Sequence, residues 1–101
     1  MTSNLNSRQR AHLRRLAHKL KPVILVGSEG VTDRVVRSVE EAFHTRELLK
    51  VKALEGAPEP IRSVAEALRE ALPGAEVVQT IGRTAVLYRA DPEAPEIELP
   101  R

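Results

Sequence analysis

Cysteine and tryptophan are absent from this chain of 101 residues, and phenylalanine and tyrosine occur once each. The absence of cysteine excludes disulfide bonds, thiol catalysis and cysteine-ligated metal sites. No apolar run approaches the length of a membrane-spanning helix, and the N-terminus lacks the apolar segment of a secretory signal peptide. We therefore expect a cytoplasmic protein with no membrane contact, and the length indicates a single domain.

Acidic residues are missing from positions 1–28, a segment that contains six basic residues. Positions 91–101 show the reverse bias, with four acidic residues and only Arg101 as a basic one. The formal net charge of +2 therefore hides a strongly basic N-terminal part. Such a part favours an acidic partner. Nucleic acid is preferred over a membrane surface, because no basic segment combines its charges with large apolar anchors such as Trp or Phe.

The segment from Val23 to Asp33 predicts a buried strand, a tight turn and the start of a helix. Residues 23–26 are apolar and mostly β-branched, and Gly27 and Gly30 then allow backbone conformations closed to other residues. Thr32 can cap the following helix. A turn of this kind presents backbone N–H groups at a helix N-terminus, where phosphate binds. The alternative is a tight connection without a ligand, and two glycines three apart do not decide between them.

Hydrophobic periodicity predicts the order α-β-α-β-α-β-β. The expected helices are residues 6–20, 32–44 and 61–72, and the expected strands are residues 23–26, 48–54, 75–81 and 84–89. This order indicates an α+β fold, with a four-stranded mixed sheet and helices packed against it. We expect a monomer with one domain over residues 1–90. Residues 91–101 should be a poorly ordered acidic tail, in which 96–99 alternate enough to allow a short docked strand.

The first predicted helix has basic residues on both sides of its apolar stripe. The stripe consists of Leu13, Leu16, Ala17 and Leu20. At about 100° per residue, one flank contains Arg8, His12, Arg15 and Lys19, and the other contains Arg10, Arg14 and His18. A solvated helix surface usually mixes charges of both signs. The lack of acidic residues therefore favours a binding role for this helix over a purely solvated one.

Five motifs in a fixed order resemble the CRM domain, named for chloroplast RNA splicing and ribosome maturation, in its stand-alone bacterial YhbY-like form. These are residues 7–14, 20–23, 27–30, 47–52 and 81–89, and the resemblance covers about residues 5–90. It implies a fold like the C-terminal domain of translation initiation factor 3. It also implies a Gly-x-x-Gly loop used as in KH domains, and RNA binding during assembly of the large ribosomal subunit. Ser28 and Glu29 depart from the pattern, because family members commonly carry a basic residue inside the loop.

The expected RNA contacts are the loop backbone and a set of cations. The loop residues are Gly27, Ser28, Glu29 and Gly30. The cations are Arg8, Arg14, Arg15, Lys19, Lys21, Lys50, Lys52 and Arg83. Lys50 and Lys52 alternate with apolar residues and so share one face of a strand, where they could equally protect a sheet edge. Phe43 is expected in the core, and Tyr88 either packs in the hairpin or stacks on a base. Because few aromatic side chains are available for stacking, recognition of RNA should rest mostly on charge and backbone shape.

Two other classes of function are the alternatives to RNA binding. The three histidines, His12, His18 and His44, form no known metal or nucleophile motif, so we expect no enzyme activity, metal, cofactor or small-molecule substrate. The alternative to RNA is a protein-interaction module, whose basic helix docks on an acidic protein partner or on the acidic tail of the chain itself.

Overall fold

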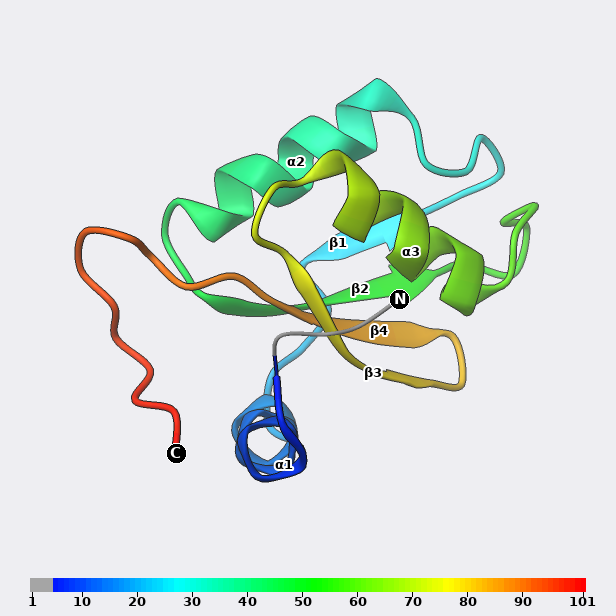
Figure 1. Cartoon of the computed structure of the whole chain (residues 1–101). Coiled ribbons are helices and arrows are strands. Elements are labelled where there is room, and N and C mark those ends of the chain that lie inside the picture. The colour runs from blue at the N-terminus through cyan, green and yellow to red at the C-terminus, as the bar shows by residue number, and fades with distance from the viewer. Residues whose placement is uncertain (1–4) are drawn as a thin grey trace.

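Seven elements follow one another in the predicted order in the computed structural model, which describes residues 5–101. The helices are α1 (Ser7–Ala17), α2 (Asp33–Phe43) and α3 (Ile61–Ala71). The strands are β1 (Ile24–Val26), β2 (Leu48–Ala53), β3 (Glu76–Ile81) and β4 (Thr84–Tyr88). They form one sheet in the order β1-β2-β4-β3, in which only β1 and β2 are parallel (Figure 1). The predicted α+β class and the mixed four-stranded sheet are confirmed.

The two faces of the sheet are covered unequally. Helices α2 and α3 lie on one face and α1 alone lies on the other (Figure 1). Alternation along β2 explains the division: Leu49 and Val51 face α2 and α3 in the main core, whereas Leu48 joins the smaller cluster around Leu13 of α1. Helix α1 has 11 residues and leaves part of this face of the sheet uncovered.

Helix α1 ends at Ala17, three residues before the predicted end at Leu20. The Leu20 N–H bonds to the Ala17 carbonyl, a contact to the third residue back that is typical of a closing turn. Pro22 has no N–H and disfavours helical backbone at Lys21, which limits the helix to Leu20. The closing turn ends it sooner, and the Leu20 carbonyl accepts a hydrogen bond from Lys50 instead of continuing the helix. Leu20 is consequently exposed instead of completing the apolar stripe. The predicted start is correct, because Asn6 forms a capping box with Gln9.

Strand β1 is an edge strand of three residues, not the buried strand that its apolar sequence predicts. Val26 is fully buried in the main core, but Leu25 is 56% exposed. The difference follows from alternation at a sheet edge, since Leu25 points to the face on which α1 is the one helix.

Residues 91–101 are docked on the body of the protein, which contradicts the prediction of a poorly ordered tail. The carboxylate of Glu47 is 5% exposed and accepts three backbone N–H groups of the tail. The donors are Asp91, Glu96 and Ile97, at 2.6, 2.9 and 2.7 Å. Ile97 and Leu99 pack on the α1-side cluster, so the tail covers apolar surface without forming a strand.

Both aromatic side chains are buried. Phe43 is 5% exposed and Tyr88 is 6% exposed, which confirms the core position of Phe43 and the packing alternative for Tyr88. Arg89 lies over the Phe43 ring at 4.9 Å and donates two hydrogen bonds to Glu40, at 2.8 and 2.9 Å. Glu40 is therefore an ion-pair partner that joins α2 to the end of β4.

Candidate nucleic-acid interface

The part of the sheet that α1 leaves uncovered presents two rows of side chains. One row crosses all four strands in register as Leu25, Lys52, Thr84 and Ile81. The next row contains Lys50, Val86 and Gln79. We call the surface formed by Leu25, Lys50, Lys52, Gln79, Ile81 and Thr84 the open face. It combines two lysines with neutral hydrogen-bonding groups and with Leu25 and Ile81, which are 56% and 62% exposed.

A β-bulge in β3 directs two of these side chains. The register shifts between Val77 and Gln79, so that Val78 is an extra residue in β3 relative to β4. Gln79 and Ile81 thereby point to the α1 side, which strict alternation from Val77 would not allow. Arg10 of α1 holds the bulge, because its guanidinium donates to the carbonyls of Val77 and Val78 at 2.6 and 2.8 Å.

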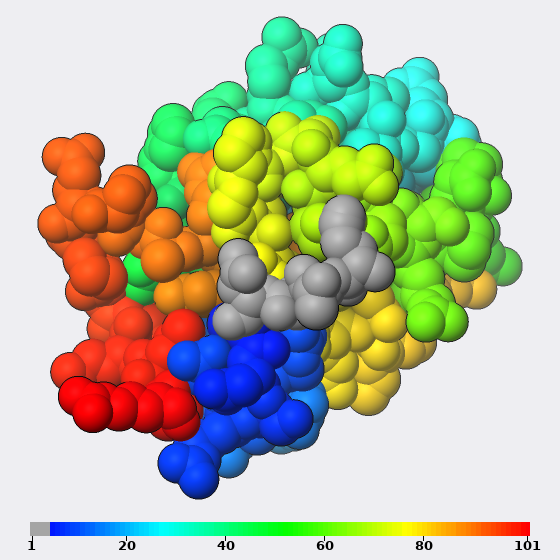
Figure 2. Space-filling model, in the orientation of Figure 1, coloured from blue at the N-terminus to red at the C-terminus, as the bar shows by residue number. Residues whose placement is uncertain are grey.

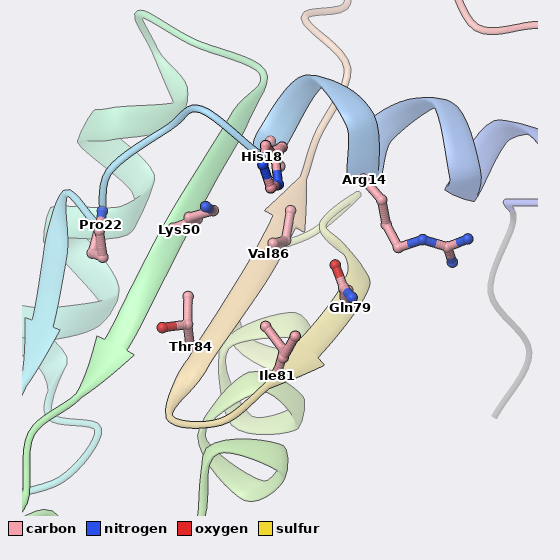
Figure 3. Close-up of a pocket in the computed structure, with 9 residues that line it drawn as sticks. Arg14, His18, Pro22, Lys50, Gln79, Ile81, Thr84 and Val86 are labelled. Atoms are coloured by element: carbon pink, nitrogen blue, oxygen red, sulfur yellow. The ribbon is translucent and has the colours of Figure 1, made fainter.

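A hollow of about 250 Å³ lies between α1 and the open face. We call it the α1–sheet hollow; Figure 3 shows its residues, which are Arg14, Ala17, His18, Pro22, Lys50, Gln79, Ile81, Thr84 and Val86. A wider depression, lined by Ala11, Arg14, Arg15, His18 and Gln79, adjoins it. Neither lining contains a carboxylate. The pair of hollows is therefore suited to an anion.

Lys50 has a fixed place in this hollow. Its ammonium group donates to the carbonyl of Leu20 at 2.9 Å, in the turn that follows α1. The early end of α1 thus supplies an acceptor for this lysine. One donor is used in this way, and an ammonium group has two more for a ligand.

The structure brings together some of the cations predicted from sequence and separates others. Arg14 and Lys50 line the main hollow, Arg15 lines the adjoining one, and Lys52 is exposed on the open face. Three further cations, Arg8, Lys19 and Lys21, are exposed but line neither hollow.

Arg83 lies in the β3–β4 turn, at the same end of the sheet as the Gly-x-x-Gly loop. The Ala53 N–H donates to the Arg83 carbonyl and the Leu54 N–H donates to the Val26 carbonyl, both at 2.8 Å. The end of β2 is therefore tied to the turn on one side and to the last residue before the loop on the other.

The Gly-x-x-Gly loop is a closed turn. The Gly30 N–H donates to the Gly27 carbonyl at 3.0 Å, and Gly30 has a φ of 73°. The Gly30 N–H is therefore not among the free N–H groups that the turn is predicted to present. Within residues 5–101, the N–H groups of Ser28 and Glu29 have no protein acceptor. The predicted cap on α2 is present, with the Val35 N–H bonded to the Thr32 hydroxyl at 3.2 Å.

The RNA contacts expected from the sequence did not include four side chains that line the α1–sheet hollow: His18, which was placed on a flank of the first helix, and Gln79, Ile81 and Thr84. The alternation of side chains between the two faces of a sheet could have identified Thr84. No sequence signal marks the bulge that directs Gln79 and Ile81. In the described part of the chain, no group of three or more His, Asp or Glu side chains could hold a metal ion.

The acidic tail and the α1–sheet hollow lie on opposite flanks of α1. Gln9 donates to the Pro100 carbonyl at 3.0 Å, whereas Arg14 and His18 line the hollow. At about 100° per residue, Gln9 and Arg14 are roughly 140° apart around the helix. Figure 2 likewise shows the tail along one side of α1 and β3 along the other. The docked tail therefore leaves the hollow uncovered.

Known proteins resemble this chain over nearly its whole length. The family model of the CRS1/YhbY (CRM) domain matches residues 5–89. A Bacillus subtilis protein named as the probable RNA-binding protein YqeI is 43% identical, over 95% of this chain and 99% of its own. An RNA-binding protein of Haemophilus influenzae is 38% identical over 98% of both chains. The solution structure of the hypothetical protein SAV1595 from Staphylococcus aureus matches with a TM-score of 0.79 and 36% identity, over 95% of this chain and 99% of its own. Among residues 5–101, no helix is both long and apolar enough to span a membrane.

Proposed function

The chain belongs to the CRS1/YhbY (CRM) domain family, and from this membership we propose that it binds RNA through the face of the sheet that carries α1. The names of the two bacterial relatives support this function, since both are called RNA-binding proteins and both align over almost the entire chain. The proposed function needs no cofactor, metal or catalytic residue.

The acid-free lining of the two adjoining hollows carries the proposal. Arg14, Arg15 and Lys50 meet there with His18, and Lys52 follows on the open face. Cations bind the phosphates of RNA, and these contacts position the strand without reading its sequence. Since both aromatic side chains are buried, recognition rests on charge and backbone shape.

The Gly-x-x-Gly loop provides a second contact in this proposal. The N–H groups of Ser28 and Glu29 donate to a phosphate that approaches the turn. The Glu29 carboxylate repels a phosphate placed directly on it. The RNA strand therefore passes on the side where the positive charges of Arg83 and Lys52 offset this repulsion. The outward cations Arg8, Lys19 and Lys21 add long-range attraction.

The target in this proposal is ribosomal RNA in a particle that precedes the mature large subunit. The resemblance to a domain family named for ribosome maturation supports this choice. The protein acts as a monomer in the cytoplasm, with residues 1–90 as the RNA-binding domain and the acidic tail 91–101 docked on it.

Equilibrium binding to large-subunit ribosomal RNA fragments, measured across salt concentration, tests the function. We expect a double variant, Arg14→Ala with Arg15→Ala, to bind more weakly. Single-strand contacts give a log–log salt slope of about −0.7 per neutralised phosphate, so the slope should become shallower by about 1.4. Both side chains are exposed, so the variant should fold normally.

The matched control is Arg46→Ala with Arg62→Ala, which removes the same charge from exposed positions that line neither hollow. An equal loss in both variants would reduce the effect to net charge and contradict the assigned surface. Absence of RNA binding at low salt would contradict the function itself and favour an acidic protein partner for the basic helix. If the protein binds unrelated RNA of the same length as tightly as it binds the ribosomal RNA fragments, the proposed ribosomal target is contradicted.

A further inference from the structure

The α1–sheet hollow has more structure than binding of a phosphate backbone requires. Its end next to α1 is cationic, and its end next to the β3–β4 turn is neutral (Figure 3). Arg14, His18 and Lys50 form the cationic end. Ile81 and Thr84 form the neutral end, and Gln79 and Val86 lie between the two ends, in the same row as Lys50. Open lysine and arginine surfaces bind phosphates without such a neutral compartment beside them.

The neutral end is built by contacts elsewhere in the fold. The bulge that turns Gln79 and Ile81 toward α1 is held by two hydrogen bonds from Arg10. Lys50 is held at the opposite end by the Leu20 carbonyl. Both ends are therefore in place before any ligand arrives, which lowers the ordering cost of binding.

We propose that the α1–sheet hollow receives one unpaired nucleotide of the bound RNA, with its phosphate at the cationic end and its base against Ile81. This assignment rests on the proposed function and adds a nucleotide site to it. The Gln79 amide offers donors and an acceptor, and the Thr84 hydroxyl offers one of each, so both can bond to a base edge. Ile81 is 62% exposed and loses water contact when a base packs on it.

The size and the access of the hollow agree with this ligand. Its volume of about 250 Å³ is below the roughly 300–1,000 Å³ of typical small-molecule sites, which suits a ligand as small as one nucleotide. The acidic tail lies on the opposite flank of α1 and does not compete for it. The lysines of β2 connect the hollow with the loop end of the sheet, because Lys52 follows Lys50 on the same face.

A double variant, Gln79→Ala with Ile81→Ala, tests the nucleotide site without removing charge. Its affinity for a short single-stranded RNA of mixed sequence should fall about tenfold, as for loss of one base contact. Its salt slope should equal that of the wild type, because no phosphate contact is lost. Its affinity for an RNA duplex of the same sequence should not change, because paired bases cannot enter the hollow.

The control is Thr80→Ala, which lies between the two substituted residues but points to the opposite face of β3. If wild-type protein binds single-stranded RNA and the double variant binds as well as this control, the nucleotide site is wrong while the proposed function stands. If the wild type binds no RNA, both fall. Oligoglutamate of equal charge is the competitor that tests an acidic protein segment. If it displaces the RNA, and if its affinity falls in the double variant as much as that of RNA does, the hollow belongs to an acidic protein segment and the proposal is overturned.

Discussion

The two glycines of the loop have different reasons to be glycine. Gly30 has a φ of 73°, and a Cβ placed there would lie 3.3 Å from Cγ of Pro58. Gly27 does not have a positive φ, and a Cβ there would meet nothing within 4 Å. The fold therefore requires glycine at position 30 but not at position 27. The absence of a side chain at position 27 leaves room for a ligand to approach the loop backbone from outside.

We predict that Gly30→Ala destabilises the protein by about 1–2 kcal/mol, the cost of a left-handed backbone conformation for alanine. Gly27→Ala should leave the free energy of unfolding nearly unchanged and weaken RNA binding about tenfold, or by about 1.4 kcal/mol. Chemical denaturation and equilibrium binding of the two variants measure both effects. Full RNA affinity in Gly27→Ala would exclude close approach of a phosphate to the loop.

Glu40 makes stability depend on pH. The hydrogen bonds from Arg89 are the main cause that lowers the pKa of the Glu40 carboxyl from its usual 4.5 to about 2. A lowered pKa in the folded state stabilises the protein above the unfolded value, and this contribution is lost as the pH falls from about 4.5 to 2. The side chain is 38% exposed, so solvent screening keeps the contribution small.

The variant Glu40→Gln should therefore be less stable than the wild type at neutral pH. The difference in free energy of unfolding should shrink as the pH falls from 4.5 to 2. Urea denaturation across this range measures it, with Glu41→Gln, an exposed neighbour, as the control. A difference that stays constant with pH would show that the ion pair with Arg89 does not contribute.

At the scale of elements, the tail depends on a single buried carboxylate. Three backbone N–H groups of residues 91–97 donate hydrogen bonds to the carboxylate of Glu47. Ile97 and Leu99 cover apolar surface beside α1. The acidic and proline-rich composition of the tail predicts disorder, because composition describes the tail without its contacts to the rest of the protein. The acceptor that orders the tail is 44 to 50 positions away in the sequence.

We predict that Glu47→Ala releases the tail and destabilises the protein by about 2–4 kcal/mol, because hydrogen bonds to a charged acceptor are lost. Hydrogen exchange should accelerate at the amides of Asp91, Glu96 and Ile97, and much less in the central strands β2 and β4. Glu98→Ala, an exposed acidic residue of the tail, is the control. Unchanged exchange at the three amides would contradict the role of Glu47.

The elements themselves could be predicted from the sequence because they follow local rules. Apolar periodicity located α2 and α3 within one residue at every boundary, and Thr32 caps α2 as expected. The errors arose where long-range contacts decide. The end of α1, the exposure of Leu25 and the bulge in β3 depend on which face α1 covers and on where Arg10 reaches.

At the scale of the whole molecule, the sheet separates a structural side from a candidate binding side. Helices α2 and α3 complete the main core on one face, whereas the other face carries the one short helix α1 with Ile97 and Leu99 of the tail beside it. The sequence identified Arg14, Lys50 and Lys52 by charge, but charge alone did not show which cations share a surface. That surface follows from the register of four strands and from the orientation of α1.

Mapping of amide chemical shifts during titration of the wild-type protein with single-stranded RNA tests the central claim most directly. We predict that the largest shifts occur in the second half of α1, on the open face and in residues 27–30. The exposed sides of α2 and α3 should change little. Shifts that concentrate on α3, or that spread evenly over both faces of the sheet, would contradict the assignment of RNA binding to the face that carries α1.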